Sequence, residues 1–342
     1  MGRWTRVLAV AVAGAALAVA LGAAACGGND DGGITVYSGR SEDLIGPLLD
    51  RFEEETGIPA EVRYGDTAEM AATILEEGDG TPADVYIGQD AGALGALDKE
   101  GRLAPLPRGI LELVDSPRFA AADGTWVATS GRVRVLGYDR RELRAADLPD
   151  SVFDLTDGRW RGEVGWAPAN GSFQAFVTAM RLEHGDERTE RWLRDMAANG
   201  AVAYDNNVLI RDAIASGEIR VGLLNHYYME RAKAELANPA DYPVGTHIFP
   251  DGDVGSLINV AGAGVVAGSD AQEDAQQLVR FLLSPESQAY FAEQTREYPV
   301  AGGAAPPEDL PALAAIEQPR VDLNDLDDLR GTLQLIERAG IL

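Results

Sequence analysis

Residues 34–64 read ITVYSGRSEDLIGPLLDRFEEETGIPAEVRY and contain the strand–helix–strand unit that decides the fold. Residues 34–37 are a short β-rich run. The apolar residues between Leu44 and Phe52 are spaced for one face of a helix, and Gly57 ends that helix. Residues 60–64 then predict a second strand. Strands and helices that alternate at such short intervals are typical of a parallel sheet covered by helices.

The same alternation continues along most of the chain, which predicts the α/β class. A long extended segment at 125–138 interrupts it and is expected to cross from one domain to another. Ligands of open α/β sheets bind outside the carboxyl ends of the strands, so the loops there are the places to look for a site. Further strands are predicted at 83–87, 163–166, 202–204, 220–224 and 258–267, and further helices at about 68–77, 89–99, 172–183, 208–216, 229–236, 271–283 and 329–338.

The first residues have the pattern of an export signal. Arg3 and Arg6 give a positive start, residues 7–25 carry no charge, and small residues precede Cys26. A membrane-spanning helix is the alternative, but the apolar run is barely long enough and ends at a Gly/Asp-rich stretch. The sequence therefore predicts a secretory signal peptide over residues 1–25.

Cys26 is the only cysteine, so no internal disulfide can form. Residues 21–26, LGAAAC, resemble a bacterial lipobox, in which the cysteine is lipidated and becomes the mature N-terminus; Ala23 stands where Leu is usual. A buried core cysteine is disfavoured by the polar, Gly-rich residues that follow. We expect residues 26–33 to be the lipidated cysteine and a flexible tether.

Charge and length limit the class of protein. Removing residues 1–25 leaves about 317 residues with 27 basic and 55 acidic side chains, a net charge of about −28. Such acidity argues against nucleic acid and against an anionic lipid surface. With 46% hydrophobic residues the chain can build proper cores, and its length suits two domains or one large one.

The segment LNHYY at 224–228 ends a predicted strand immediately before a helix. Because the alternation of side chains breaks at such a junction, Tyr227 and Tyr228 can both face a cleft. Two phenols suit a hard trivalent cation, since a bound metal lowers the proton affinity of its ligands. Two aromatic residues that pack a lobe interface are the alternative, and His226 beside them is more often packed than a ligand.

Candidate anion-binding residues lie in the same half of the chain. Asn170-Gly171-Ser172 and Asn206-Asn207 each open a predicted helix, where backbone N–H groups and the helix dipole favour anions. Plain helix capping is the alternative. Asn225 adds an amide next to the tyrosines. Arg132 and Arg134 alternate along a strand and share one face, which either meets an anion or is simply solvated.

Catalytic machinery is not indicated. The three histidines have no partners at a recognised metal spacing, no Gly-x-Ser-x-Gly or Walker-type motif is present, and Cys26 is the only thiol. We therefore expect a binding protein and not an enzyme.

Several segments, taken in order, resemble the ferric-ion-binding proteins of bacterial iron importers. They cover nearly all of the chain from about residue 33 to 300. The matching segments are 34–40, 52–58, 81–86, 130–135, 225–228 and 297–300.

This resemblance implies a type II periplasmic-binding-protein fold, in which two α/β lobes are joined by two extended hinge strands around a ligand cleft. It implies Fe(III) held by Tyr227 and Tyr228, with phosphate or carbonate as a synergistic anion. The anion would be held at Asn170, Gly171, Ser172, Asn207 and Asn225, with Arg132 or Arg134 as the anion-binding arginine. The expected limits are 34–130 for lobe 1, completed by about 256–300, then 131–255 for lobe 2 and 301–342 for a C-terminal segment.

The first lobe departs from the family pattern. Many members carry His, or His followed by Tyr, just after the segment equivalent to Ser38-Gly39-Arg40, where this chain has Ser41 and Glu42. Some members use a Glu near the position of Gly88, which Gln89 and Asp90 follow here. The metal would then be completed by the anion, water, or a carboxylate such as Glu42 or Asp90.

The expected function is an extracytoplasmic lipoprotein that captures ferric iron for the permease and ATPase of an ABC importer. It would be a monomer, anchored through its lipid alone to the outer face of the cytoplasmic membrane. One alternative is the same fold binding an organophosphate, a phosphonate or another small anion. A second alternative is an exported enzyme.

Overall fold

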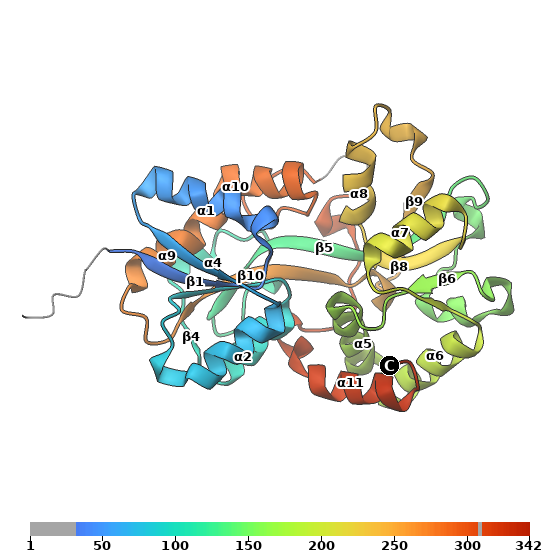
Figure 1. Ribbon diagram of the computed structural model, residues 1–342, viewed down its shortest axis with the longest axis horizontal. Coiled ribbons are helices and arrows are strands. Elements are labelled where there is room, and N and C mark those ends of the chain that lie inside the picture. Colours follow the sequence, from blue (N-terminus) through green and yellow to red (C-terminus); the bar gives the residue numbers. More distant parts are fainter. Residues whose placement is uncertain (1–31, 307–309) are drawn as a thin grey trace, which may run out of the picture. The chain divides into compact units, whose positions relative to one another are not determined.

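One long strand, β5, lies in the middle of the strand order and pairs with strands of both halves (Figure 1). The computed structural model describes residues 32–306 and 310–342. Residues 32–342 form one unit. The order is β2-β1-β3-β10-β5-β8-β6-β7, with β4 beside β10 and β9 beside β5. The strands are β1 (Ile34–Ser38), β2 (Ala60–Tyr64), β3 (Val85–Gly88), β4 (Leu103–Ala104), β5 (Trp126–Asp139), β6 (Val164–Trp166), β7 (Val202–Ala203), β8 (Val221–Asn225), β9 (Val244–His247) and β10 (Ile258–Val266).

Strand β5 changes partner between Val133 and Arg134. Up to Val133 it pairs antiparallel with β10, and from Arg134 it pairs antiparallel with β8 and β9. The first lobe consists of β1, β2 and β3, which are mutually parallel, with β4 and β10; the second consists of β6, β7, β8 and β9. This is the expected type II periplasmic-binding-protein fold, and the predicted crossing segment at 125–138 is confirmed as β5. The residue limits expected for the lobes stay a prediction.

Helices cover the strands of each lobe. They are α1 (Glu42–Thr56), α2 (Thr67–Glu77), α3 (Ala91–Lys99), α4 (Arg108–Leu111), α5 (Gly171–His184), α6 (Asp186–Ala198), α7 (Asn207–Ser216), α8 (Tyr227–Ala234), α9 (Gln272–Leu282), α10 (Pro285–Tyr290) and α11 (Leu329–Arg338). In α1 the predicted apolar face is buried, and Gly57 ends the helix with φ 74°, a backbone conformation that favours glycine.

Neighbouring side chains of the first-lobe strands enter separate apolar clusters. Val36 and Val85 pack with residues of α1 and α9, whereas Tyr37 and Tyr86 pack with residues of α2 and α3. Period-two alternation therefore buries both faces of these strands, as expected for a sheet with helices on each side.

Several elements were not predicted from the sequence. Helix α6 is rich in charge and buries only Thr189, Trp192, Leu193 and Met196, so its apolar face is narrow. Strand β9 is four residues long and contains a glycine. The sheet is also mixed rather than parallel, because β10 and β5 run antiparallel to their neighbours.

The C-terminal segment contacts both lobes. Its 3₁₀ turn, Leu323–Asp327, packs on α3, where a Cβ atom on Gly92 would lie 2.5 Å from the carbonyl oxygen of Leu326. Helix α11 then packs on α5 and α6, and the hydroxyls of Thr332 and Thr178 are 2.7 Å apart. The predicted helix at 329–338 is confirmed.

The predicted signal peptide at 1–25, Cys26 and nearly all of the predicted tether lie outside the described residues. In the part of the chain that the structure describes, no helix is long and apolar enough to cross a membrane.

Candidate functional site

A cavity of about 620 Å³ is lined by residues of both lobes and of the C-terminal segment. Strand ends and helix starts supply most of its wall, as expected for an open α/β sheet. The wall includes Gly39, Asp66, Thr67, Gln89, Asp90, Arg132, Asn170, Gly171, Ser172, Gln174, Asp205, Asn225, Tyr227, Tyr228, Leu326, Asp327 and Leu329.

Tyr227 and Tyr228 are the first two residues of α8 and both line this cavity. Strand β8 ends at Asn225, and the backbone is already helical at His226, so the tyrosines no longer point to opposite faces. Their ring centroids are 4.3 Å apart with the planes tilted by 31°. The structure thus brings the two predicted metal ligands together, both half-buried.

Burial raises the pKa of Tyr227 well above its usual value of 10, and the neighbouring Tyr228 raises it further. The positive charge of Arg132 acts in the opposite direction. Tyr227 is therefore a neutral phenol at pH 7 in the free protein. A cation would have to displace its proton in order to use the oxygen as a ligand.

Arg132 is 3% exposed and lines the cavity beside these tyrosines. Its Nη1 atom is buried and has no hydrogen-bond partner among residues 32–306 and 310–342. A buried cation is stable only with compensating charge or hydrogen bonds, so this side chain favours a negatively charged group in the cavity.

The start of α5 is capped by its own residues. The Oδ1 atom of Asn170 accepts hydrogen bonds from the Ser172 amide at 3.1 Å and from the Ser172 hydroxyl at 2.6 Å. Asn207 does not line the cavity; its Nδ2 atom donates to the same Oδ1 at 3.2 Å. The capping role considered for this loop is observed, while Asn170, Gly171, Ser172 and Asn225 still border the cavity.

Arg134 does not line the cavity, although it shares a strand with Arg132. Its guanidinium lies 5.2 Å from the ring centre of Phe173 and 4.8 Å from that of Phe176. It donates to the carbonyl oxygens of Ser172 and Leu223 at 3.4 and 3.3 Å. Burial lowers the pKa of Arg134 to about 9. It supports the first turn of α5 from behind, which corrects its assignment as an anion ligand.

The segment after β1 also differs from expectation. Of Ser38, Gly39, Arg40, Ser41 and Glu42, only Gly39 lines the cavity. Ser41 and Glu42 are exposed at the start of α1, so Glu42 is wrongly placed to complete a metal site with the tyrosines. The Ser38 hydroxyl donates to the Arg40 carbonyl oxygen at 2.9 Å.

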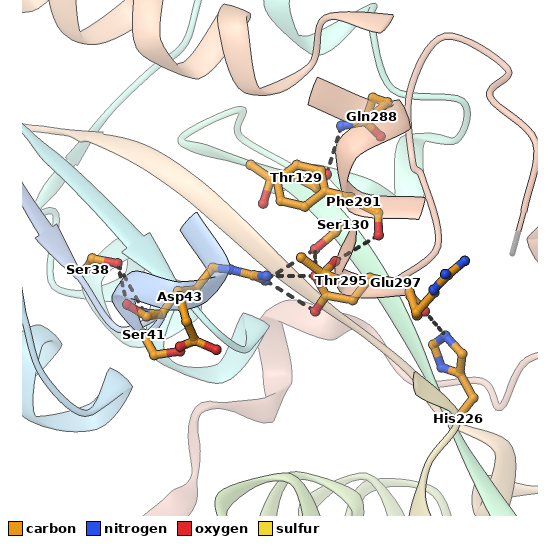
Figure 2. Close-up of polar contacts among 12 residues, drawn as sticks. Ser38, Ser41, Asp43, Thr129, Ser130, His226, Gln288, Phe291, Thr295 and Glu297 are labelled. Carbon is orange, nitrogen blue, oxygen red and sulfur yellow. Dashed lines mark hydrogen bonds and ion pairs between the residues drawn. The ribbon is translucent and has the colours of Figure 1, made fainter. Parts of the chain in front are cut away.

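Arg40 is fully buried because it pairs with a carboxylate far along the chain. Its Nη2 atom lies 2.7 Å from Oε2 of Glu297, and Nη1 donates to the Ser130 hydroxyl at 3.3 Å. Ser130 and Thr295 also donate to Glu297, as Figure 2 shows. Arg40 is therefore a structural cation and not a cleft residue.

Gln89 and Asp90 do line the cavity, as predicted. The Oδ1 atom of Asp90 caps α3 by accepting from the Ala93 amide at 3.1 Å. Buried Oε1 of Gln89 has no partner within the described ranges. Together with Gly39 they form the part of the first-lobe wall that lies at the ends of β1 and β3.

Several acidic and amide residues of the wall were missed, namely Asp66, Gln174, Asp205 and Asp327. Asp66 and Asp205 follow the predicted strands at 60–64 and 202–204, a position that could have identified them. Asp327 does not follow a predicted strand, so no sequence pattern pointed to it. No group of three or more His, Cys, Asp or Glu side chains that could hold a metal occurs in the described part of the chain. A metal bound here would depend on the tyrosines.

His226 is fully buried, and burial lowers its pKa to about 4. It packs against Tyr298 with ring centres 4.8 Å apart and does not line the cavity. The sequence-based preference for a packed histidine over a ligand agrees with this position.

Residues 80–328 match the model of a family described as bacterial extracellular solute-binding protein. The chain is 29% identical to the Fe(3+)-binding periplasmic protein of Serratia marcescens, with 97% of each chain covered. It is 31% identical to the major ferric iron-binding protein of Neisseria meningitidis serogroup A, covering 90% of this chain and 93% of the relative.

Solved structures of iron-bound proteins are also similar to this chain. Iron-bound HitA from Pseudomonas aeruginosa is 34% identical, with a TM-score of 0.82 over 90% of this chain and 99% of that one. A Trichodesmium protein in complex with iron and citrate is 26% identical, with a TM-score of 0.79 over 91% and 100%. These relatives are binding proteins and not enzymes. With its two lobes and its cavity at the strand ends, the chain belongs to the bacterial extracellular solute-binding proteins.

Proposed function

We propose that this protein binds ferric iron through Tyr227 and Tyr228, together with a synergistic anion at Arg132, and delivers it to an ABC importer. The observation that carries the proposal is the pair of phenols whose rings lie 4.3 Å apart on the wall of one cavity. Relatives named as ferric iron-binding proteins match nearly the whole chain, which supports iron as the ligand.

The phenol oxygens suit this ligand chemically. Fe(III) is a hard, highly charged cation, and its charge stabilises phenolate far below the usual pKa of a tyrosine. Because the pKa of Tyr227 is raised in the free protein, iron binding releases a proton from it. The apparent affinity for iron should therefore rise with pH, by about tenfold per unit for each proton released.

The anion is assigned to the neighbourhood of Arg132. Its unpartnered Nη1 atom, the Asn225 side chain and the start of α5 border the same cavity as the tyrosines. Phosphate or carbonate bound there would pair the buried cation and occupy iron coordination positions that the tyrosines leave open. A relative solved with both iron and citrate supports the combination of metal and anion.

The first lobe lacks the family histidine, so its contribution to the metal is assigned to the residues that line the cavity. Asp90 is the leading carboxylate because one of its oxygens caps α3 and its side chain borders the cavity. Gln89 offers a neutral oxygen beside it. Glu42 is not retained, since it is exposed on α1.

The test is to add Fe(III) with phosphate or carbonate and to record the visible tyrosinate-to-iron absorption band. We expect a band in the wild-type protein and none in the Tyr227→Phe/Tyr228→Phe double variant. Tyr242→Phe, whose hydroxyl is buried outside the cavity, serves as the control and should keep the band. A wild-type protein without a band would end the iron proposal, and a band in the double variant would end the site assignment.

A phosphate-type anion alone is the second candidate ligand, because Arg132 favours an anion whether or not a metal is present. Thermal stabilisation by phosphate or an organophosphate in metal-free buffer, without further stabilisation by Fe(III), would support that alternative. Stabilisation that needs both components supports the iron proposal.

Anchoring and transport complete the proposal. The lipobox resemblance at 21–26 supports a lipid on Cys26, and the family supports delivery to a permease and its ATPase. Replacing Cys26→Ser should release the protein from the cell surface into the medium. Retention of the variant at the membrane would contradict the lipid anchor.

A further inference from the structure

His226 precedes the tyrosine pair and is held at both ring nitrogens. The backbone N–H of Val133 donates to Nδ1 at 3.1 Å. On the opposite side of the ring, Nε2 lies 2.9 Å from the carbonyl oxygen of Arg296. A carbonyl oxygen only accepts and an amide N–H only donates, so the proton is on Nε2 and the ring is the neutral Nε2–H tautomer.

These two bonds join parts of the molecule that are far apart in sequence. Val133 is the last residue of β5 that pairs with β10, just before the strand changes to β8. The backbone amide of His226 also donates to the Val133 carbonyl oxygen at 3.0 Å. Arg296 follows the π-helical turn Phe291–Thr295 and lies two residues before Tyr298, which bridges to Gly131 in the part of β5 that pairs with β10. The ring therefore connects the second-lobe tyrosines to the first lobe.

The Arg296 side of this connection adjoins a network of buried hydrogen bonds. Arg296 has φ 61°, a left-handed conformation that is uncommon for a residue other than glycine. Glu297 follows immediately and is fixed by Arg40, Ser130 and Thr295. Figure 2 shows this cluster around Glu297, with His226 reaching the adjoining backbone.

On the second-lobe side, His226 contacts Tyr227 directly. The ring of Tyr227 meets that of His226 edge-on, with centroids 5.9 Å apart and planes at 89°. Tyr298 packs on the same imidazole at 4.8 Å. A shift of the His226 ring would therefore move Tyr227, and with it the oxygen that is proposed to bind the metal.

We propose that His226 is a positioning residue, which holds Tyr227 and Tyr228 at a fixed place relative to the first lobe by bridging Val133 and Arg296. The inference rests on the proposed iron function. His226 is not itself a metal ligand, because both of its nitrogens are used within the protein. Residues 295–297 thus influence the bound iron although they do not line the cavity.

The first experiment compares His226→Leu and His226→Gln with His247→Leu. His247 is the matched control: it is half-buried, its Nε2 lies 2.8 Å from the Pro149 carbonyl oxygen, and it does not line the cavity. Each protein is loaded with Fe(III) and phosphate, and the tyrosinate-to-iron band and the rate of iron loss to a competing chelator are recorded.

We expect His226→Leu to keep a band of altered wavelength and to lose iron about 10–100-fold faster, as for other residues that orient metal ligands. His226→Gln should lose iron at an intermediate rate, because its amide N–H can still reach the Arg296 carbonyl oxygen. His247→Leu should match the wild type in both readouts. A folded His226→Leu with the wild-type band and rate would overturn the proposal.

The second measurement needs neither a variant nor iron. The ¹⁵N NMR shifts of the His226 imidazole in the metal-free wild type should show a protonated Nε2 and an unprotonated Nδ1 at pH 7. The opposite tautomer, or an imidazolium, would overturn the bridge even if the Leu variant failed to fold. A missing iron band in the wild type would instead defeat the proposed function and leave this result standing.

Discussion

Arg40 and Arg132 are both buried arginines near the ends of first-lobe strands, yet their surroundings are opposite. Arg40 is paired with Glu297 at 2.7 Å and is surrounded by hydroxyl groups. Arg132 lines the cavity, and its buried Nη1 has no partner within the described residues. Glu297 thus forms an ion pair with the first of these cations and acts on the second only through its charge. The first is suited to holding the fold and the second to binding a ligand.

The largest expected effect is on the paired arginine. Glu297→Gln leaves Arg40 buried without its carboxylate, which should reduce the free energy of unfolding by about 3–5 kcal/mol. Urea denaturation of the metal-free protein measures this. Glu112→Gln is the control, because Glu112 pairs with Arg108 at the surface, with side chains 59% and 89% exposed. That change should stay within about 1 kcal/mol. Equal losses in both variants would contradict a structural role for the buried pair.

Removing the unpaired arginine should act on binding instead. Arg132→Met is expected to weaken iron binding in phosphate by roughly 10–150-fold, the equivalent of about 1.5–3 kcal/mol for a hydrogen bond to a charged group. The unfolding free energy of the metal-free protein should change little, since the loss of a buried charge that has no ion pair among the described residues offsets the loss of its attraction to Glu297. Competition titrations with and without phosphate measure the first effect. A loss of stability without a loss of affinity would reverse the roles given to the two arginines.

The pH dependence of stability reports on Glu297. Burial raises the pKa of Glu297, but the charge and hydrogen bonds of Arg40, together with the charge of Arg132, outweigh it, so the pKa is lowered overall. A carboxyl whose folded pKa is below its unfolded value of about 4.3 stabilises the protein above that value. This stability is lost as the pH falls through the folded pKa.

Unfolding free energies measured between about pH 3 and 7 should therefore fall more steeply with acid in the wild type than in Glu297→Gln. Arg132→Met should lose only part of the wild-type slope, because the charge of Arg132 also lowers the pKa of Glu297 while the Arg40 pair stays in place. Identical slopes in all three proteins would show that Glu297 does not carry this dependence.

Arg134 gives the smallest expected effect. Arg134→Lys loses the stacking on Phe173 and Phe176, which should reduce the unfolding free energy by about 0.5–2 kcal/mol. Because Arg134 does not line the cavity, iron affinity should change far less than in Arg132→Met. An affinity loss as large as that of Arg132→Met would restore Arg134 as a ligand-binding residue.

The local elements were predictable because their patterns are local. Residues 60–64 and 329–338 form the strand and helix that their sequences indicate. The different positions of Arg132 and Arg134 were not predictable from their spacing in the sequence. Arg132 and Arg134 share a strand face, but the rings of Phe173 and Phe176 and the carbonyl oxygens of Ser172 and Leu223 hold the second one away from the cavity.

The partner of Arg40 was equally hidden, since Glu297 is 257 positions away in the sequence. The tyrosine pair was easier to identify because a strand-to-helix junction is visible in the sequence itself. Long-range electrostatic pairs therefore mark the limit of prediction at this site, whereas junctions between elements do not.

The C-terminal segment has a mechanical consequence. The turn at Leu323–Asp327 packs on α3 of the first lobe and also contacts α5 of the second, and α11 packs on α5 and α6. Any swing of one lobe away from the other must therefore separate this turn from α3 or from α5. The segment acts as a short tether that restricts how far the two lobes can separate.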